Sequence, residues 1–349
     1  MPNVLDIRRR IRSVTNTRQI TKAMKMVSAA KLRRAQERAL AARPFAQMLT
    51  NVLKSLVSRA EVYDPDTGEP RHPLLAQREE KTALLIVISG DKGLAGAFNT
   101  NILKTAMEAI HRTQERKVAV EIETIGRKGR DFLRRRFPVT QPRTADSKDA
   151  PNVALIGERI GVLNKFDYAL ADEIAKIVIS RYCKGEIDSV YILYNEFKSV
   201  IQQRLVVEVV LPIGRIGTID VKQVREQTEK EKYEAKKAAV AAGVGMRATA
   251  DKEAEEKAAQ FGAANVDYIY EQPPDELFRD LLPKYVGIQI FHALLESVAA
   301  EHAARMTAME AATNNATDMI ESLTLAMNRA RQAKITKEII EIVSGAAAL

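Results

Sequence analysis

The sequence predicts an α/β fold in which a long antiparallel coiled coil of N- and C-terminal helices carries a small Rossmann-like α/β domain. Three observations support this fold class. Apolar residues recur at a 4,3 spacing near the C-terminus, a narrow apolar stripe opens the chain, and strand-like and helix-like segments alternate between them. We place the N-terminal coiled-coil helix at 1–60, the α/β domain at 80–212, a charged and mainly helical insert at 213–266, and the C-terminal coiled-coil helix at 280–349.

The first segment is amphipathic and strongly basic. One long helix is predicted over 3–57 by a narrow apolar stripe, whose members are Ile7, Ile11, Val14, Ile20, Met24 and Val27. Residues 1–43 hold twelve Lys and Arg against only Asp6 and Glu37, a net charge of +10 in a chain whose total is +9. The basic character therefore belongs to one element, and we expect the partner that it implies to face that element.

From residue 81 to 211 the pattern changes to short strands and helices. The continuous apolar run at 83–88 is typical of a strand buried on both faces, and a helix follows from near Asn99. Further elements are predicted along this stretch, namely strands at 118–125, 189–194 and 204–211 and helices at 127–136 and 157–183. The alternation favours a mainly parallel sheet whose last two strands pair as a hairpin.

The insert is rich in Lys, Glu and Ala from 222 to 257, and it shows almost no apolar face. Gly243 and Gly245 interrupt it. This composition favours a solvated helical hairpin or a partly disordered segment over an element that docks on the rest of the chain.

The C-terminal segment carries the longest periodic pattern, about six heptads without an internal proline or glycine. Its seam consists of Ile288, His292, Leu295, Ala299, His302, Met306, Met309, Thr313, Ala316, Ile320, Leu323, Met327 and Ala330. A helix over 283–344 would be roughly 90 Å long at about 1.5 Å per residue. The seam then slips by one position, to Ile335, Ile339 and Ile342, which predicts a local change of supercoil. Neither terminal helix can bury itself alone, so we expect the two to pair.

No chemistry-bearing constellation can be identified, so we predict no catalytic residue, no cofactor site and no metal site, and hence that the chain is not an enzyme. Cys183 is the only cysteine, which excludes an intramolecular disulfide and suits a reducing compartment; we expect it to be packed. His292 and His302 lie ten residues apart on the seam, too far to share one ion. No apolar run reaches the length of a membrane span.

Two other classes of function stay open on the residues alone. Residues 89–96 stand where a phosphate-binding loop would, as in a Rossmann-type nucleotide-binding enzyme, but their spacing fits neither usual phosphate-loop motif and favours a tight turn. The basic first helix would suit a coiled-coil nucleic-acid-binding protein, although it offers no stacking aromatic before Phe45. The end of the chain favours a protein partner, because over 339–349 only Glu341 has a charged side chain.

Several stretches, in order along the chain, closely resemble the γ subunit of bacterial F-type ATP synthases, the central rotor shaft. They are residues 7–36, 89–99, 268–271, 301–306, 312–316, 328–333 and 342–346. The resemblance implies a coiled coil inserted into a catalytic α/β hexamer, with the α/β domain outside it. It also implies that the shaft transmits c-ring rotation to the hexamer and regulates ATPase activity and proton flow.

The resemblance further implies the partners and the location. The partners are the α and β subunits of the hexamer, the epsilon subunit and the c-ring, with no nucleic acid; ATP and magnesium bind to the hexamer. The chain would meet the membrane only through the c-ring, as a peripheral protein on the cytoplasmic face of the bacterial inner membrane.

Individual residues match positions with known roles in that family. Met24 and Lys25 match shaft positions that face acidic loops of β. Tyr270 and Glu271 match the foot that meets the c-ring. The polar positions of the final helix that are associated with coupling are matched by Arg305, Arg331, Gln332, Thr336, Glu338 and Glu341. The 213–266 insert departs from the family, in which this link is commonly shorter.

Overall fold

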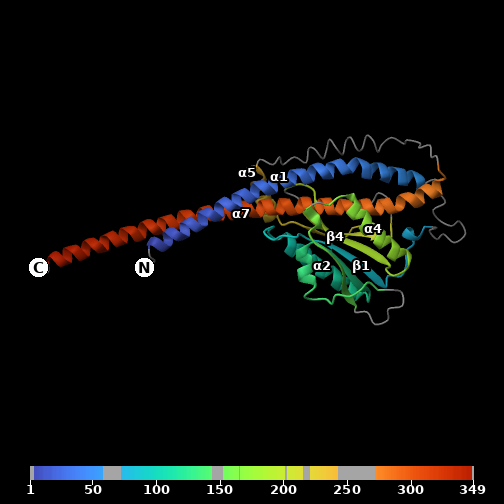
Figure 1. Cartoon of the computed structure of the whole chain (residues 1–349), viewed down its shortest axis with the longest axis horizontal. Coiled ribbons are helices and arrows are strands. Elements are labelled where there is room, and N and C mark those ends of the chain that lie inside the picture. Colours follow the sequence, from blue (N-terminus) through green and yellow to red (C-terminus); the bar gives the residue numbers. More distant parts are fainter. Residues whose placement is uncertain are drawn as a thin grey trace.

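Two long helices from opposite ends of the chain dominate the computed structural model, which describes residues 4–57, 72–143, 152–164, 166–200, 203–214, 221–242 and 272–347. They are α1 (Val4–Val57) and α7 (Pro274–Ala347). The two helices run antiparallel, so both termini lie at the same end of the rod, and α7 extends beyond α1 (Figure 1). The predicted antiparallel pairing is therefore confirmed. At about 1.5 Å per residue, α7 is about 110 Å long.

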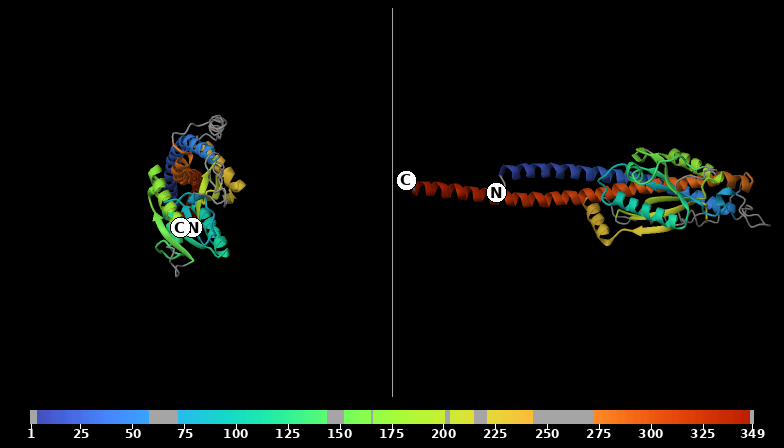
Figure 2. Two further views of the ribbon diagram at one scale, coloured as in Figure 1. Left: turned by 90° about the vertical axis from the view of Figure 1, so that its right-hand side faces the viewer. Right: turned by 90° about the horizontal axis from the view of Figure 1, so that it is seen from below.

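The other elements are arranged around α7. Besides α1, it contacts α4 (Tyr168–Cys183), β4 (Ser189–Phe197) and α5 (Glu229–Ala241). Its middle is enclosed, with Val286, Ile290, Ala293, Leu294, Ala300, Ala303 and Met306 fully buried. Figure 2 shows the rod emerging from the α/β domain as a bare helical pair. The helix that pairs with α1 is therefore also the core helix of the domain.

The start of α7 lies earlier than predicted. Proline fits the first helical position, Pro274, because no helical N–H is required there. Phe278 and Leu282 are buried in the main core, so the added turns gain packing energy. Pro283, the predicted start, lies inside the helix.

A six-stranded sheet forms the α/β domain, in the order β3-β2-β1-β4-β5-β6. The first four strands of this order are parallel, β5 pairs with β4 in the antiparallel direction, and β6 pairs antiparallel with β5. The remaining strands are β1 (Thr82–Ile88), β2 (Ala119–Ile125), β3 (Val153–Arg159), β5 (Gln203–Leu211) and β6 (Val221–Glu226). α2 (Phe98–Glu115) and α3 (Arg127–Leu133) cover the face of the sheet away from α7 (Figure 1). The parallel order confirms the predicted Rossmann-like character.

The predicted helix over 157–183 is wrong in its first third. Its first residues, 157–159, belong to β3, which pairs with β2, and α4 begins only at Tyr168, capped by the Asp167 carboxylate. Gly157 allows the close approach of β2, since a Cβ there would lie 3.1 Å from Glu123 Cγ. Cys183, at the end of α4, is exposed rather than packed.

The insert also differs from its prediction within its described part, 221–242. β6 adds a strand to the sheet beside β5, which was not predicted, and the 13-residue helix α5 follows it. α5 begins with a capping box between Thr228 and Glu231 and packs on α7. It buries Ala235, Ala238 and Ala239, so it is docked rather than solvated. Gly243 and Gly245 lie outside the described residues.

The seam of α1 departs from the predicted stripe after Val14. Ile20 and Val27 are 60% and 57% exposed. The buried positions that replace them, and that keep the 4,3 spacing from Ile7, are Thr21, Lys25, Ser28, Leu32 and Ala35. The true seam therefore passes through polar side chains, and a pattern of apolar residues alone shifts to the neighbouring positions.

Candidate functional site

A polar layer crosses the seam between the two long helices. Lys25 Nζ lies 2.6 Å from Glu310 Oε2, and both side chains are buried. Next to this pair, the hydroxyls of Thr21 and Thr313 are hydrogen-bonded at 2.8 Å. Met24 is half-buried. The Lys25 ammonium therefore faces Glu310 across the seam, and its contact with acidic loops of a partner stays a prediction.

The insert touches the same layer. Lys25 Nζ also donates a hydrogen bond to the carbonyl oxygen of Ala241, at the end of α5, at 3.4 Å. One ammonium group thus joins α1, α7 and α5. Any displacement of α5 removes one of its hydrogen-bond acceptors.

A second polar contact joins α7 to the turn after β1. Arg305 Nη2 lies 2.5 Å from Glu301 Oε1, and it donates to the carbonyl oxygen of Gly93 at 3.5 Å. A Cβ on Gly90 would lie 2.9 Å from that same Glu301 oxygen. The turn thus approaches α7 most closely at a position without a side chain. Arg305 is accordingly buried at the joint between helix and domain.

The turn at 89–96 is held by neighbouring protein groups. Ser89 Oγ accepts the N–H of Gly129 at 2.8 Å, and Asn99 Oδ1 accepts the N–H of Gly90 at 2.9 Å. Asp91 Oδ1 accepts the backbone N–H groups of two further residues, Arg127 and Gly161. These bonds favour a strand-to-helix turn that anchors α2, α3 and α7 over a phosphate-binding loop.

His302 lies beside this joint in its neutral form. Burial, with smaller contributions from the positive charges of Arg305 and Lys31, lowers the pKa of His302 to about 4. Its Nδ1 is 3.4 Å from Arg305 Nη1. Across the part of the chain that the structure describes, no cluster of three or more His, Cys, Asp or Glu side chains could hold a metal ion.

The end of α7 is an uncovered tip. Seam positions are at least half-buried as far as Ala330, and from 331 to 344 every residue except Ala333 is exposed. Ile339 and Ile342 are 55% and 71% exposed. The predicted slip of the seam is therefore wrong as a coiled-coil feature, because α1 begins at Val4 and does not reach this stretch.

The tip brings together five of the predicted partner-contact residues, all exposed: Arg331, Gln332, Thr336, Glu338 and Glu341. Lys334 pairs with Glu338 at 3.6 Å, and Lys337 pairs with Glu341 at 3.5 Å; the two residues of each pair are one helical turn apart. Such exposed pairs contribute little to stability, so the side chains are free to exchange partners.

The remaining predicted residues are dispersed. Lys25 and Arg305 are buried in the two polar contacts above, while Tyr270 and Glu271 lie outside the described residues. Sequence reasoning missed the partners Glu310 and Glu301. A signal for the first was present, because a lysine at a 4,3 seam position requires an acid on the facing helix.

No helix in the described ranges combines the length and the apolar character needed to cross a bilayer.

Comparison with known proteins gives a consistent result. A family model described as ATP synthase matches residues 3–349. An ATP synthase gamma chain from Solibacter usitatus is 47% identical over 348 residues, covering 100% of this chain and 99% of the relative. One from Anaeromyxobacter sp. is 44% identical over 350 residues, with 100% of both chains covered.

Solved structures agree on the fold. A chain from the Euglena gracilis mitochondrial ATP synthase, in a structure of OSCP, F1 and c-ring, aligns with a TM-score of 0.53 at 18% identity, covering 99% of this chain and 94% of its own length. A chain from the Tetrahymena thermophila mitochondrial ATP synthase, in a structure of central stalk and c-ring, aligns with a TM-score of 0.50 at 23% identity. The alignment covers 84% of this chain and 99% of the Tetrahymena chain. On the strength of the family model and the full-length relatives, this chain belongs to the ATP synthase family whose matching members are named ATP synthase gamma chain.

Proposed function

We propose that this chain is the central rotor shaft of a proton-translocating F-type ATP synthase. The uncovered tip of α7 carries the proposal. Four of its aliphatic side chains, Ile339, Ile340, Ile342 and Val343, are more than half exposed at the end of a rod. Isolated apolar surface of this kind is a liability in water unless a partner encloses it. A sleeve formed by the catalytic α/β hexamer would do so.

The shaft would act through differential contacts. At each angle the asymmetric rod presents a different surface to each β subunit, and it can shift their conformations only by the difference in contact free energy. Arg331 and Gln332 offer several donors to carboxylates of the hexamer, in bonds that are made and broken at each step. The chain itself would do no catalysis, since the nucleotides bind to the hexamer.

The other partners follow from the resemblance. The foot, Tyr270 and Glu271, would meet the c-ring, and the epsilon subunit would be a further partner. The chain would thus be a peripheral component at the cytoplasmic face of the bacterial inner membrane, in contact with the bilayer only through the c-ring.

The insert gives the shaft a means of regulation. α5 packs on α7 and supplies an acceptor to Lys25, beside the polar layer. We propose that it limits ATP hydrolysis by the complex. Deleting 229–260 while keeping β6 should raise hydrolysis relative to synthesis, and unchanged rates of both would remove this role.

Co-expression with α and β subunits tests the shaft proposal. The chain should purify in one complex with both, and the variant Ile335→Ser/Ile339→Ser/Ile342→Ser should assemble poorly. Ile177→Ser/Val240→Ser, which alters exposed aliphatic residues on α4 and α5, is the matched control and should assemble normally. A chain that purifies alone, or that binds ATP by itself in equilibrium dialysis, would contradict the proposal.

A further inference from the structure

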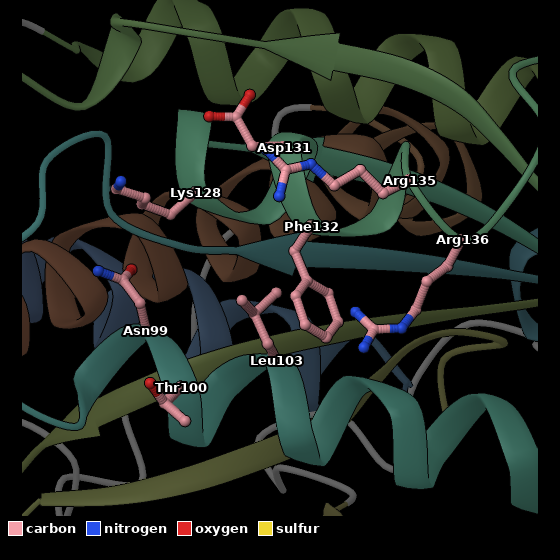
Figure 3. A pocket seen from close by; sticks show the side chains of 8 residues that line it. All are labelled: Asn99, Thr100, Leu103, Lys128, Asp131, Phe132, Arg135 and Arg136. Atoms are coloured by element: carbon pink, nitrogen blue, oxygen red, sulfur yellow. The ribbon is translucent and has the colours of Figure 1, made fainter.

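A groove on the α/β domain is not accounted for by the shaft. It lies between α2 and α3, on the face of the sheet away from α7, and its volume is about 710 Å³. The groove is lined by Asn99, Thr100, Leu103, Lys128, Asp131, Phe132, Arg135 and Arg136 (Figure 3). Its volume falls within the range of about 300 to 1,000 Å³ that is usual for ligand-binding pockets.

The groove belongs to a second basic region of the chain. Residues 127–136 contain six Lys and Arg and one acid, a net charge of +5. The basic character of the chain is therefore not confined to α1, as the sequence alone suggested. Two of the six cations are neutralised nearby: Arg130 pairs with Asp131 at 2.7 Å, and Arg134 lies 3.9 Å from Glu158.

Three cations of the lining have no ion-pair partner among the described residues: Lys128, Arg135 and Arg136. All three are exposed. The Arg136 guanidinium lies over the ring of Phe132, 3.7 Å from its centroid. This stacking holds the guanidinium plane against the groove with its N–H groups available at the edge, an arrangement that suits a carboxylate.

The floor of the groove is apolar. Leu103 is buried and Phe132 is half-buried, packed against the core. Figure 3 shows these two side chains between Lys128 at one end and Arg136 at the other. The cations thus flank an apolar centre and do not converge on one point. A single phosphate group requires converging donors, whereas an extended chain can place acids at both ends and an apolar side chain between them.

We propose that the α2–α3 groove binds an acidic segment of a partner protein, with an apolar side chain on Phe132 and Leu103 and carboxylates on Lys128, Arg135 and Arg136. Complementary charge gives such a contact its specificity and its sensitivity to salt. The Asp131 carboxylate, already paired with Arg130, presents little negative charge to oppose the segment.

A fluorescein-labelled peptide, Glu-Glu-Leu-Phe-Glu-Glu, tests this with the full-length chain by fluorescence anisotropy. Arg135→Gln/Arg136→Gln should weaken binding by about tenfold or more, because two charge-assisted contacts are lost. Both residues are exposed, so the fold should be retained, which circular dichroism verifies. Lys184→Gln/Lys237→Gln, directly after α4 and on α5, makes the same change of charge elsewhere and should bind the peptide as the unmodified chain does.

Further measurements decide between the proposed ligand and simpler anions. A peptide in which Leu-Phe is replaced by Ser-Ser should bind more weakly, and so should the original peptide with Phe132→Ala. Equal binding of both peptides, equal weakening by the control variant, or no binding of the first peptide would overturn the proposal. So would displacement of the peptide by inorganic tripolyphosphate or by phosphatidylglycerol vesicles, which would indicate a phosphate site or a membrane surface instead.

Discussion

Lys25 and Glu310 form a buried ion pair at 2.6 Å across the seam of the coiled coil, flanked by the hydrogen bond between Thr21 and Thr313. Polar groups at a seam specify register, because any slip leaves them buried and unpaired. In a rod that transmits torque, one fixed register is a mechanical requirement. Together the two contacts also fix the orientation of α1 and α7, since Lys25 can face Glu310 while Thr21 faces Thr313 only if the helices are antiparallel.

Replacing only one residue of this ion pair should strongly destabilise the coiled coil. Lys25→Met leaves the Glu310 carboxylate buried without its counter-ion, and we expect a loss of about 3 to 5 kcal/mol in the free energy of unfolding. The double variant Lys25→Met/Glu310→Met should recover most of that loss. Urea unfolding followed by circular dichroism at 222 nm measures both.

The matched control for the ion pair is Lys334→Met. Lys334 and Glu338 form an exposed pair at 3.6 Å on the tip, whose removal should change stability by less than about 1 kcal/mol. Equal losses for Lys25→Met and Lys334→Met would show that the seam pair is not a structural determinant.

Gly126, which directly follows β2, packs against the turn after β1 and should not tolerate a side chain. This residue has φ of +104°, and a Cβ there would lie 1.9 Å from the backbone oxygen of Ser89. Gly126→Ala should therefore displace the turn that anchors α2, α3 and α7, with a loss of about 4 kcal/mol or more. Scanning calorimetry measures the effect.

Gly161→Ala separates the energetic cost of backbone strain from the cost of a steric clash. Gly161 also has positive φ, +75°, but a Cβ there would meet nothing within 4 Å. Its substitution should cost about 1 kcal/mol, for the backbone conformation alone. If the two variants melt alike, close packing at Gly126 does not constrain the turn.

Much of this architecture could be predicted from periodicity. The two long helices, β1, β2, α2 and the β4–β5 hairpin all lie where the pattern predicts them, although the buried positions of α1 differ from its apolar stripe after Val14. β3 was missed because its apolar run, 153–156, is short and passes into the charged residues Glu158 and Arg159, which read as the start of a helix. A strand at the edge of a sheet needs fewer apolar residues than one in its middle.

The candidate site was harder to predict, because part of it depends on residues that meet only in three dimensions. Glu310 meets Lys25 across two helices from opposite ends of the chain, whereas Glu301 stands four residues before Arg305 on one helix, a spacing that the sequence does display. The sequence predicts a solvated α5 because Ala235, Ala238 and Ala239 each present little apolar area. Their small size is what allows α5 to pack closely on α7.

A buried carboxyl in the sheet should make stability depend on pH. Burial, with a smaller contribution from Glu196, raises the pKa of Glu208 to about 7, against the lowering effect of the hydrogen bond from Tyr194. Between pH 4.5 and about 7 the folded chain therefore binds a proton that the unfolded chain has released. The stability contributed by Glu208 accordingly falls as the pH rises through this window.

Glu208→Gln should remove that dependence, because the amide keeps an acceptor for Tyr194 but does not ionise. Relative to the unmodified chain, the variant should gain about 3 kcal/mol between pH 5 and 8, from urea unfolding at each pH. Glu79→Gln, at an exposed position, is the control and should leave the profile unchanged. If the free energy of unfolding of Glu208→Gln changes with pH just as that of the unmodified chain does, this carboxyl is already ionised in the folded chain over the same pH range.

The exposed polar residues of the tip should affect coupling and not folding. Arg331→Glu/Gln332→Ala reverses one charge and removes one amide at positions that are solvent-exposed in the isolated chain, so its thermal unfolding should match that of the unmodified chain. In the assembled complex, acidic partner groups would meet a negative charge where a donor stood, at a cost of about 1.5 to 3 kcal/mol per lost charge-assisted bond. Proton-driven ATP synthesis in membrane vesicles should therefore fall about tenfold or more while co-purification with α and β is retained. Arg112→Glu/Gln114→Ala, a matched change on α2 away from the rod, should leave synthesis intact. Normal synthesis by the tip variant would show that the rod transmits rotation without these two side chains, through the shape of the helix alone.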